Sequence, residues 1–453
     1  MRKIRLLHIH STGDSSSPIL CSLESVPLAS PPPFIALSYC WGELTVTHNV
    51  KIKGQAVPVA TNLYSALRRL RAGRIEVVWV DALCINQHDQ EERSLQITRM
   101  AKIFRKATQV AVWLGYEGSI KGDDIRTLAT LKPDHKIHEV STSARLALDQ
   151  LLASPYWTRV WIIQEISAAS DILILYGKCE IPWKGLLSGA RCVISKSGKL
   201  IIPTDSGSAR ERLERLNQIR ADRLACRPVG LLDALHRSLL AFSTDPKDKL
   251  YAPLGLAFDA DAFIPEPNYN QSVTEVYVDF MTALIERGFP LDFIYLRTAP
   301  RAISGDLPSW VVDWNDLRDA LAEATFRHIR WKTPLESDPD RANLVQVNGG
   351  TLILRASLIA HIDRLDPTAP HNYIDATQKP FRVGMSWAEF HNGEFGYVHP
   401  QSRNGDVIAD VEGCFSPVVL RPITDRYHVI GRCHLLFNHR EADVIETKEI
   451  TVC

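Results

Sequence analysis

One glutamate of this chain occurs in an apolar helical stretch, where a carboxylate is unexpected. In the segment RVWIIQEI, the residues three and four positions from Glu165 are all apolar, so no basic side chain of the same helix can pair with it. A carboxylate in such surroundings is either removed from water, which raises its pKa, or directed into a cleft. Two roles therefore stay open: a functional acid, or a structural ion pair with an arginine of another element, such as Arg159.

A second group of candidates ends the short apolar strand in FIALSYCWGE, residues 34–43. The rings of Tyr39 and Trp41 could offer flat surfaces to a planar ligand. Gly42 would let the backbone approach a ligand closely, and the Ser38 hydroxyl could donate to a ligand oxygen. The alternative is structural: core aromatic rings, a turn glycine and a hydroxyl that satisfies the strand end.

A third group follows the apolar run in EVVWVDALCINQ. Asp81 comes directly after this strand, and Asn86 and Gln87 add amide groups a few residues later. All three could bind a ligand at the sheet edge. For Asn86 and Gln87 the structural alternative is stronger, because asparagine readily stabilises turns through its own side chain.

Other catalytic sites find little support in the sequence. Cys84 and His88 lack a third activating residue, so a thiol hydrolase is disfavoured. Cys433, His434 and His439 lack a fourth ligand and occur in an alternating segment, so we expect no metal site. The chain also has no phosphate-binding glycine loop of the ATPase or dinucleotide type.

The elements that must position these residues alternate between strand and helix. Apolar runs end near residues 42, 81, 115 and 177, and helical periodicity fills residues 89–107 and 143–169, the latter with a break near Pro155. A hairpin is predicted around residues 54–55, followed by a helix that Thr61 caps. This alternation is typical of a parallel sheet with flanking helices, whose ligands bind at the carboxyl ends of the strands. Those ends are residues 38–42, 81–87 and 114–118.

The whole chain of 453 residues is too long for one core. Composition and periodicity predict four parts. They are an N-terminal lead-in over 1–33, rich in Ser and Pro; an α/β domain over 34–185; a mainly helical region over 186–335; and a small β-rich domain over 336–453, with a hairpin at Gly349 and Gly350.

Composition also narrows the partners. Lys plus Arg equal Asp plus Glu at 52 each, so no overall basic field would recruit nucleic acid or an anionic membrane. The nine cysteines form no Cys-x-x-Cys pair, which favours a reducing compartment and a cytoplasmic location. No run approaches the ~18 apolar residues of a membrane span, and the N-terminus lacks a full signal peptide.

Four motifs give the chain a family resemblance. The segments ALSYCWG, VVWVDALCINQHDQEERSLQITRM, VAVWLG and YWTRVWIIQEI occur in this order over residues 34–185. In order and spacing they resemble the heterokaryon-incompatibility (HET) domain of filamentous fungi. HET domains are in turn similar to TIR domains, which implies a TIR-like, flavodoxin-like α/β fold. The downstream segments DPKDKLYAPLGLA and LPSWVVDW resemble those of long HET proteins, whereas EFGYVHP departs from them.

The resemblance implies a role in nonself recognition and programmed cell death, and a chemistry. Glu165 falls at the glutamate that enzymatic TIR domains need for cleaving NAD, shortly after the tryptophan position that Trp161 occupies. The implied activity is a TIR-like NAD glycohydrolase, with NAD as substrate and no bound cofactor. One carboxylate suits this reaction, because the sugar becomes positively charged while nicotinamide leaves without an acid.

Two hypotheses follow for residues 34–185. In the first, Glu165 stabilises the transition state, and substrate binds at a larger set of strand-end and helix residues, with activity requiring self-association. That set is Ser38, Tyr39, Trp41, Gly42, Asp81, Asn86, Gln87 and Trp161. In the second, the same surface belongs to a non-enzymatic signalling module and binds a protein partner.

Overall fold

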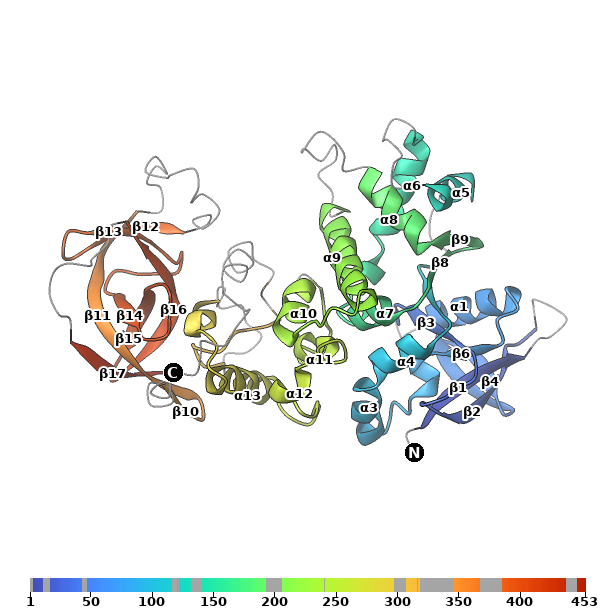
Figure 1. Ribbon diagram of the computed structural model, residues 1–453, viewed down its shortest axis with the longest axis horizontal. Coiled ribbons are helices and arrows are strands. Elements are labelled where there is room, and N and C mark those ends of the chain that lie inside the picture. Colours follow the sequence, from blue (N-terminus) through green and yellow to red (C-terminus); the bar gives the residue numbers. More distant parts are fainter. Residues whose placement is uncertain are drawn as a thin grey trace. The chain divides into compact units, whose positions relative to one another are not determined.

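The computed structural model describes two compact units (Figure 1). Unit 1 comprises Met1–Thr244, Asp248–Ala260 and Glu266–Tyr269, and unit 2 comprises Asp245–Lys247, Asp261–Pro265 and Asn270–Cys453. The described residues are 3–10, 17–42, 47–115, 120, 122–131, 140–192, 206–239, 241–296, 307–315, 317, 345–366, 385–436 and 446–453.

A nine-stranded mixed sheet forms the centre of the described part of unit 1, in the order β5-β4-β2-β1-β6-β3-β7-β8-β9. The central strands β6, β3, β7 and β8 run parallel to one another. Antiparallel pairs flank them: β1 with β6 and β2 on one side, β9 with β8 on the other. The bounds are β1 Lys3–His10, β2 Leu20–Pro27, β3 Ile35–Tyr39, β4 Thr47–Ile52, β5 Gln55–Ala60, β6 Val77–Trp79, β7 Gln109–Trp113, β8 Ile172–Tyr176 and β9 Cys179–Pro182.

This sheet corrects two expectations. The sheet is mixed and not parallel throughout: besides the four central strands only β2 and β4 pair in parallel among its described strands. The supposed lead-in of residues 1–33 contains β1 and β2, which pair with each other along their whole length and extend the sheet. The Ser- and Pro-rich composition of this segment concealed β2, because strand pairing depends on a partner that local composition does not reveal. The predicted hairpin around residues 54–55 is confirmed as β4 and β5.

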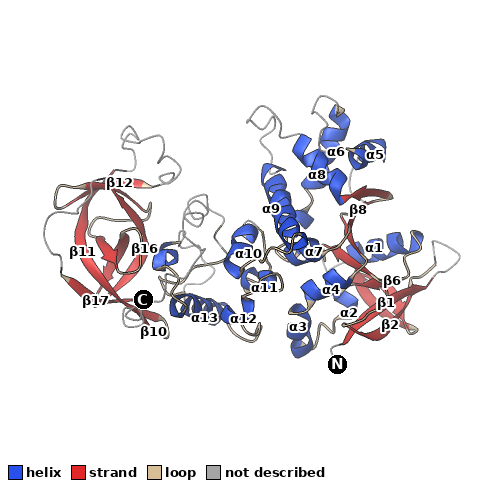
Figure 2. Cartoon of the chain, in the orientation of Figure 1, coloured by secondary structure: helices blue, strands red, loops and turns tan. Residues whose placement is uncertain are grey.

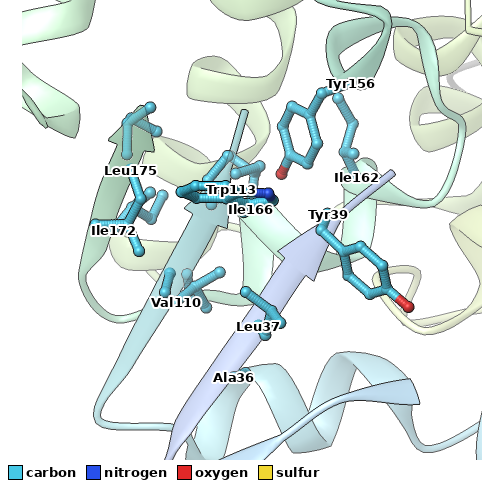
Figure 3. Close-up of a cluster of buried hydrophobic side chains, with 14 of the residues drawn as sticks. Ala36, Leu37, Tyr39, Val110, Trp113, Tyr156, Ile162, Ile166, Ile172 and Leu175 are labelled. Carbon is cyan, nitrogen blue, oxygen red and sulfur yellow. The ribbon is translucent and has the colours of Figure 1, made fainter. Parts of the chain in front are cut away.

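The central strands are buried on both faces, as their continuous apolar runs predict. All residues of β3 and β7 after the first are buried. Figure 3 shows Ala36 and Leu37 of β3 in one cluster with Val110 and Trp113 of β7 and with Ile166. Burying a large apolar side chain contributes about 1.5 to 3 kcal/mol, so this cluster anchors the strand ends that carry the candidate residues.

Helix α1, Thr61–Ala72, buries the predicted stripe that includes Leu63 and Leu67. Its cap differs from the prediction, because Ala60 occupies the N-cap position and Thr61 is the first helical residue. The predicted helix over residues 89–107 is divided into α3, Gln90–Ile97, and α4, Met100–Lys106.

The predicted break near Pro155 is confirmed, and it makes three elements of residues 143–169. These are α6, Thr142–Leu152; the 3-10 helix η2, Pro155–Thr158; and α7, Ile162–Ala168. Proline has no backbone N–H to continue a helix, so α7 starts anew and places Glu165 in its first turn. The other helices of unit 1 are α2 Asp81–Cys84, α5 Gly122–Thr130, α8 Trp183–Cys192, α9 Ser206–Leu224, α10 Leu231–Ser238 and α11 Asp248–Leu254.

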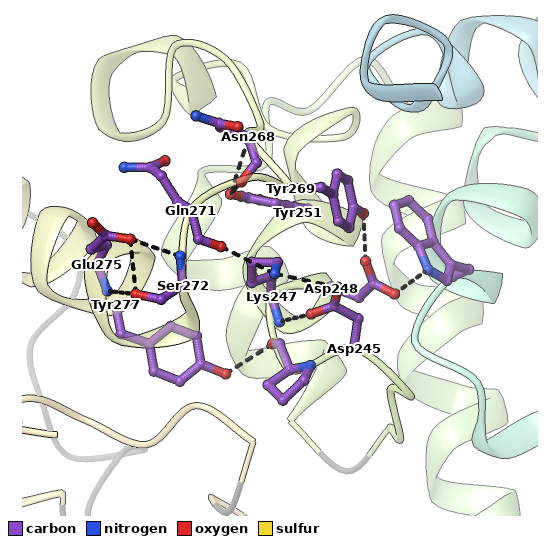
Figure 4. Close-up of polar contacts among 12 residues, drawn as sticks. Asp245, Lys247, Asp248, Tyr251, Asn268, Tyr269, Gln271, Ser272, Glu275 and Tyr277 are labelled. Atoms are coloured by element: carbon purple, nitrogen blue, oxygen red, sulfur yellow. Dashed lines mark hydrogen bonds and ion pairs between the residues drawn. The ribbon is translucent and has the colours of Figure 1, made fainter. Parts of the chain in front are cut away.

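The described part of residues 186–335 is mainly helical, and it contributes to both units. Residues 318–335 lie outside the described part. Unit 2 takes α13, Val273–Glu286, and the 3-10 helix η3, Leu291–Tyr295, while α12, Ala260–Phe263, spans the boundary. A capping box of Ser272 and Glu275 starts α13, and the Tyr277 hydroxyl donates to the Pro246 carbonyl at 2.8 Å (Figure 4). None of the helices described here is long and apolar enough to cross a membrane.

The β-rich C-terminal part is confirmed as a second sheet, drawn in red in unit 2 (Figure 2). The long strand β11 pairs with both β12 and β14, and the path β12-β13-β16-β15-β14 closes the sheet on itself around a core that includes Ile362, Phe390 and Val398. The predicted hairpin at Gly349 and Gly350 joins β10 to β11. The bounds are β10 Val345–Asn348, β11 Thr351–Asp366, β12 Ser386–Phe390, β13 Phe395–Val398, β14 Val407–Val411, β15 Val418–Ile423, β16 Arg426–Leu435 and β17 Thr447–Val452.

Candidate functional site

Glu165 lies in the interior of unit 1, next to the carboxyl end of β3. Its side chain is 3% exposed, and its Oε2 accepts a hydrogen bond from the Ser38 hydroxyl. Ser38 is itself buried and also hydrogen-bonds with the hydroxyl of Tyr156 in η2, at 2.6 Å. The turn made by η2 therefore brings Tyr156 and Glu165 to the same strand end.

Arg159 pairs with the same carboxylate. Its Nη1 lies 3.4 Å from Glu165 Oε2, and the arginine side chain is 22% exposed. Arg159 sits between η2 and α7, so the ion pair spans only six positions of the chain. This is the arrangement expected from the structural alternative for Glu165. A buried ion pair is weak evidence for a stabilising role, so the pair is compatible with both roles of Glu165.

Burial dominates the electrostatics of this pair. Removal from water raises the pKa of the Glu165 carboxyl, and Arg159 and the Ser38 hydrogen bond offset this only in part. For Arg159, burial lowers the pKa of the guanidinium, but Glu165, Cys40, Asp81 and Tyr156 together outweigh it and the net pKa is raised. Glu165 is therefore more readily protonated than an exposed glutamate, whereas Arg159 stays charged.

Asp81, which follows the end of β6, lies near Arg159 and Glu165. The Trp41 indole Nε1 donates to Asp81 Oδ2 at 2.8 Å, and the backbone N–H of Ala82 donates to Oδ1 at 2.7 Å. The Tyr39 hydroxyl is a further hydrogen-bond partner of Asp81. Removal from water raises the pKa of Asp81, opposed by the Trp41 hydrogen bond and by Arg159. The candidates from the first two strand ends thus form one cluster.

Trp41 lies at the exposed rim of this cluster. It is 37% exposed, so it is not the core aromatic of the structural alternative. Tyr39, in contrast, is 3% exposed and is the core aromatic residue that the structural alternative predicts. Burial and the Asp81 charge raise the pKa of the Tyr39 phenol, which keeps it neutral. Trp41 is therefore the aromatic side chain of this cluster that is partly exposed to solvent.

Asn62 is a contributor that the sequence analysis missed. Its Nδ2 donates to the Cys40 carbonyl at 2.7 Å, and its Oδ1 accepts from the Trp113 indole at 2.8 Å. It therefore ties the chain after β3 to the end of β7. Gly42 follows this tie with φ +71°, in the left-handed region that favours glycine. The available signal was a polar side chain next to Thr61, the residue expected to cap this helix.

Asn86 and Gln87 make contacts within their own loop. Gln87 Nε2 donates to the Asp81 carbonyl at 2.9 Å, and Asn86 Oδ1 accepts from the backbone N–H of His88 at 3.3 Å. These are the contacts of the structural alternative, so a ligand would have to displace them. Nearby, burial raises the pKa of the Cys84 thiol to about 12, which argues against a thiolate nucleophile.

Trp161 points to a different neighbour. Its Nε1 donates to Asp248 Oδ2 at 3.0 Å, and the Tyr269 hydroxyl donates to Oδ1 of the same carboxylate at 2.5 Å (Figure 4). Asp248 begins α11, in the segment DPKDKLYAPLGLA that carried no chemistry in the sequence analysis. It holds the N-terminal end of α7, so Trp161 and Asp248 position Glu165 from outside the cluster.

Two more contacts fix α7. Gln164 Nε2 donates to the Ala252 carbonyl of α11 at 2.6 Å. At the other end of the helix, Arg223 of α9 donates to the carbonyls of Ser167 and Ala169 at 2.6 and 2.8 Å. The glutamate is thus carried by a short helix whose two ends are both tied to neighbouring helices, and nothing in the spacing of these residues predicts those ties.

The described residues contain no group of three or more His, Cys, Asp or Glu side chains able to hold a metal ion. Cys433 is buried in β16 with His434 beside it, and His439 lies outside the described part. Chemically, the cluster of unit 1 offers two acids for one arginine, together with serine and tyrosine hydroxyls. Because both acids have raised pKa values, it can hold one of them protonated or bind one positive charge.

Parts of the chain are similar to known proteins. Residues 34–165 match the family model described as Heterokaryon incompatibility protein (HET). The chain is also 26% identical, over 392 aligned residues, to "Heterokaryon incompatibility protein 6, OR allele" of Neurospora crassa; the alignment covers 69% of this chain and 58% of that protein's length. No solved structure matches the chain. The residues from Phe34 to Glu165, which carry the cluster around Ser38 and Arg159, are therefore similar to the heterokaryon incompatibility family.

Proposed function

We propose that this chain acts in the cytoplasm in nonself recognition and programmed cell death of the heterokaryon-incompatibility type, and that the cluster around Glu165 cleaves NAD. The observation that carries the proposal is the meeting of Ser38, Asp81 and Glu165 at the carboxyl ends of two parallel strands. The likeness of residues 34–165 to the HET family supports the biological role. The chemistry is argued from the residues themselves.

The strand order supports a site at this edge. Numbered along the chain, the parallel strands β3, β6, β7 and β8 lie in the order 2-1-3-4. A flavodoxin-like sheet has the same order for its first four strands, and its ligand binds where the order reverses, between strands 1 and 3. In this chain that point lies between β3 and β7, where Asn62 bridges Cys40 and Trp113.

The proposed reaction needs few groups. The bond from ribose C1′ to the pyridinium nitrogen breaks, and its electron pair returns to nicotinamide, which leaves neutral. Water adds to C1′ and loses a proton, so the products are nicotinamide, ADP-ribose and H⁺. An ionised Glu165 would stabilise the positive charge that develops on the ribose, and the Trp41 indole would stack on a planar ring.

Substrate access requires the cluster to open. Glu165 is 3% exposed, and its carboxylate is occupied by Ser38 and Arg159. We therefore propose that the described arrangement is a resting form, and that self-association or a protein partner shifts α7 and releases the carboxylate. A ligand that binds the open form more tightly would shift the equilibrium in the same direction.

A second candidate has its own supporting observation. The hydrogen bonds of Asn86, Gln87 and Trp161 all go to neighbouring residues of unit 1. In a non-enzymatic signalling module these polar side chains would stabilise the fold in this way, and Trp41 at the rim would contact a protein partner.

Nicotinamide release separates the two. The purified full chain is incubated with NAD, at low and high concentration and with a crowding agent, and nicotinamide is measured by chromatography. Glu165→Ala and Glu165→Gln should lower the rate about 100-fold or more. Glu180→Gln, which alters a half-exposed surface glutamate paired with Arg69, should leave it unchanged. Release that survives both Glu165 variants contradicts the assignment, and no release from any preparation favours the signalling module.

A further inference from the structure

Tyr156 places a buried hydroxyl next to the strand end that holds Glu165. It belongs to η2 and is 1% exposed, and its hydroxyl is directed towards the ends of the strands (Figure 3). The hydroxyl lies 2.6 Å from the Ser38 hydroxyl of β3. The ring of Trp157 packs edge-on against the Tyr156 ring, with centroids 4.9 Å apart and an interplanar angle of 87°. Packing within η2 therefore fixes the phenol ring, and Ser38 receives its hydroxyl.

The hydrogen bonds of this group have one consistent direction when Glu165 is ionised. An ionised carboxylate accepts hydrogen bonds and donates none, so Ser38 donates to Oε2 of Glu165. A serine hydroxyl has one hydrogen, so the Ser38 oxygen must accept from Tyr156. Burial raises the pKa of the Tyr156 phenol well above its ordinary value, so the hydrogen that it donates is present. The result is a chain of donors from Tyr156 through Ser38 to Glu165.

The two carboxylate oxygens of Glu165 differ in their contacts. The Ser38 hydroxyl and Nη1 of Arg159 both contact Oε2. No residue in the described part of the chain hydrogen-bonds to Oε1. An ionised carboxylate has about four lone-pair sites on its two oxygens, so Oε1 keeps its capacity to accept hydrogen bonds from a ligand.

From this arrangement we propose that Tyr156 is a positioning residue for Glu165 and that it acts through Ser38. Consecutive hydrogen bonds polarise and strengthen one another, so the Tyr156 hydroxyl strengthens the bond by which Ser38 holds Oε2. Oε1 is then the oxygen that meets the substrate, where it accepts from a ribose hydroxyl and stabilises the positive charge that develops on the sugar. The role of Oε1 rests on the proposed NAD cleavage, whereas the action of Tyr156 on Glu165 does not.

Carbon-13 NMR of the purified full chain, labelled at the side-chain carboxyl carbon of glutamate, follows the titration of Glu165. Its resonance is the one that is missing from Glu165→Gln. Tyr156→Phe removes the hydroxyl and keeps the ring, so it should weaken the Ser38 bond and shift the titration midpoint of Glu165 to higher pH. The matched control is Tyr277→Phe in unit 2, which removes another buried tyrosine hydroxyl, the donor to the Pro246 carbonyl, and should leave the midpoint unchanged. An unchanged midpoint in Tyr156→Phe overturns the proposal.

A second comparison tests whether Tyr156 acts through Ser38. In a Ser38→Ala chain the donor chain has lost its middle member, so adding Tyr156→Phe should shift the midpoint of Glu165 no further. A shift as large as that seen with Ser38 present would mean that Tyr156 acts by another path, and it would overturn the proposal. The other titratable groups that interact with Glu165 are the same in both pairs of chains: Tyr39, Cys40, Asp81 and Arg159.

Nicotinamide release tests the part that depends on NAD cleavage. Tyr156→Phe should lower kcat severalfold and leave KM unchanged, because the hydroxyl serves Oε2 and does not contact substrate. A higher KM with unchanged kcat would mean that the hydroxyl binds substrate directly, and it would overturn the positioning role. The NMR titration needs no turnover. If Tyr156→Phe shifts the titration of Glu165 but no preparation releases nicotinamide, the NAD-cleaving proposal is contradicted and the action of Tyr156 on Glu165 stands.

Discussion

Ser38 and Glu165, which are 127 positions apart in the sequence, share a hydrogen bond inside unit 1. The hydroxyl comes from the last residue but one of strand β3, and the carboxylate comes from the first turn of α7. Arg159 reaches the same oxygen of the carboxylate. The orientation of Glu165 is therefore set jointly by a strand of the sheet and by the turn that precedes its own helix.

Ser38→Ala should destabilise unit 1. The change removes the Ser38 donor from the buried Glu165 carboxylate, which keeps only the longer contact with Arg159, and it leaves the Tyr156 hydroxyl without its partner on β3. An unsatisfied buried group of this kind costs about 1 to 3 kcal/mol. Urea unfolding followed by fluorescence measures the free energy, with the exposed Ser170→Ala as the matched control. Equal unfolding free energies for the two variants would show that this hydrogen bond contributes nothing.

Asp248→Ala should loosen α7 from outside the cluster. It removes the acceptor shared by the Trp161 indole and the Tyr269 hydroxyl (Figure 4). Two hydrogen bonds to a charged acceptor are lost, and we expect a decrease of about 2 to 4 kcal/mol in unfolding free energy. The emission of Trp161 should shift as its environment changes. The control is Asp261→Ala at an exposed position. An unchanged melting curve for Asp248→Ala would show that Asp248 does not position α7.

Local patterns in the sequence predicted the central strands well. The runs that became β3, β6, β7 and β8 are continuous and apolar because both faces of those strands are buried. The break at Pro155 was equally visible, since proline acts on its own helix. The sequence did not predict the pairing between distant segments, such as β1 with β6, because the sequence of one strand does not identify its partner.

The candidate site shows the same division. Ser38 and Asp81 were predicted because ligands bind at the carboxyl ends of parallel strands. Glu165 was predicted because its helical neighbours are apolar. The contacts of Asn62 with Trp113 and of Asp248 with Trp161 depend on side-chain directions across the fold, which periodicity does not encode. The partner of Glu165 was foreseen only as one of several arginines, because an ion pair between elements has no fixed spacing.

Gly42→Ala should destabilise the turn after β3 through backbone strain alone. The glycine has φ +71°, and a Cβ there would meet Asn62 Cβ at 3.6 Å, an ordinary contact. A non-glycine residue in the left-handed region costs about 1 to 2 kcal/mol, and asparagine tolerates it better than alanine. We therefore expect Gly42→Asn to unfold at higher urea than Gly42→Ala. The reverse order would mean that crowding by Asn62, and not strain, governs this position.

The raised pKa of Glu165 predicts a dependence of stability on pH. Burial raises the pKa of this carboxyl above its ordinary 4.5, so the folded chain holds the proton to higher pH than the unfolded chain. Its contribution is then greatest below pH 4.5 and is lost as pH rises from there to the folded-state pKa. Asp81 shifts in the same direction from 3.8.

Glu165→Gln keeps the shape of the side chain but does not titrate, so it isolates this effect. The unfolding free energy of the variant, relative to the unmodified chain, should increase as pH rises from about 4 towards neutrality, because only the unmodified chain must bury a charge at the higher pH. Urea unfolding across this range measures the difference, with Glu180→Gln as the control for loss of a surface carboxyl. A relative stability that instead decreases with pH would mean that Arg159 outweighs burial and lowers the pKa of Glu165.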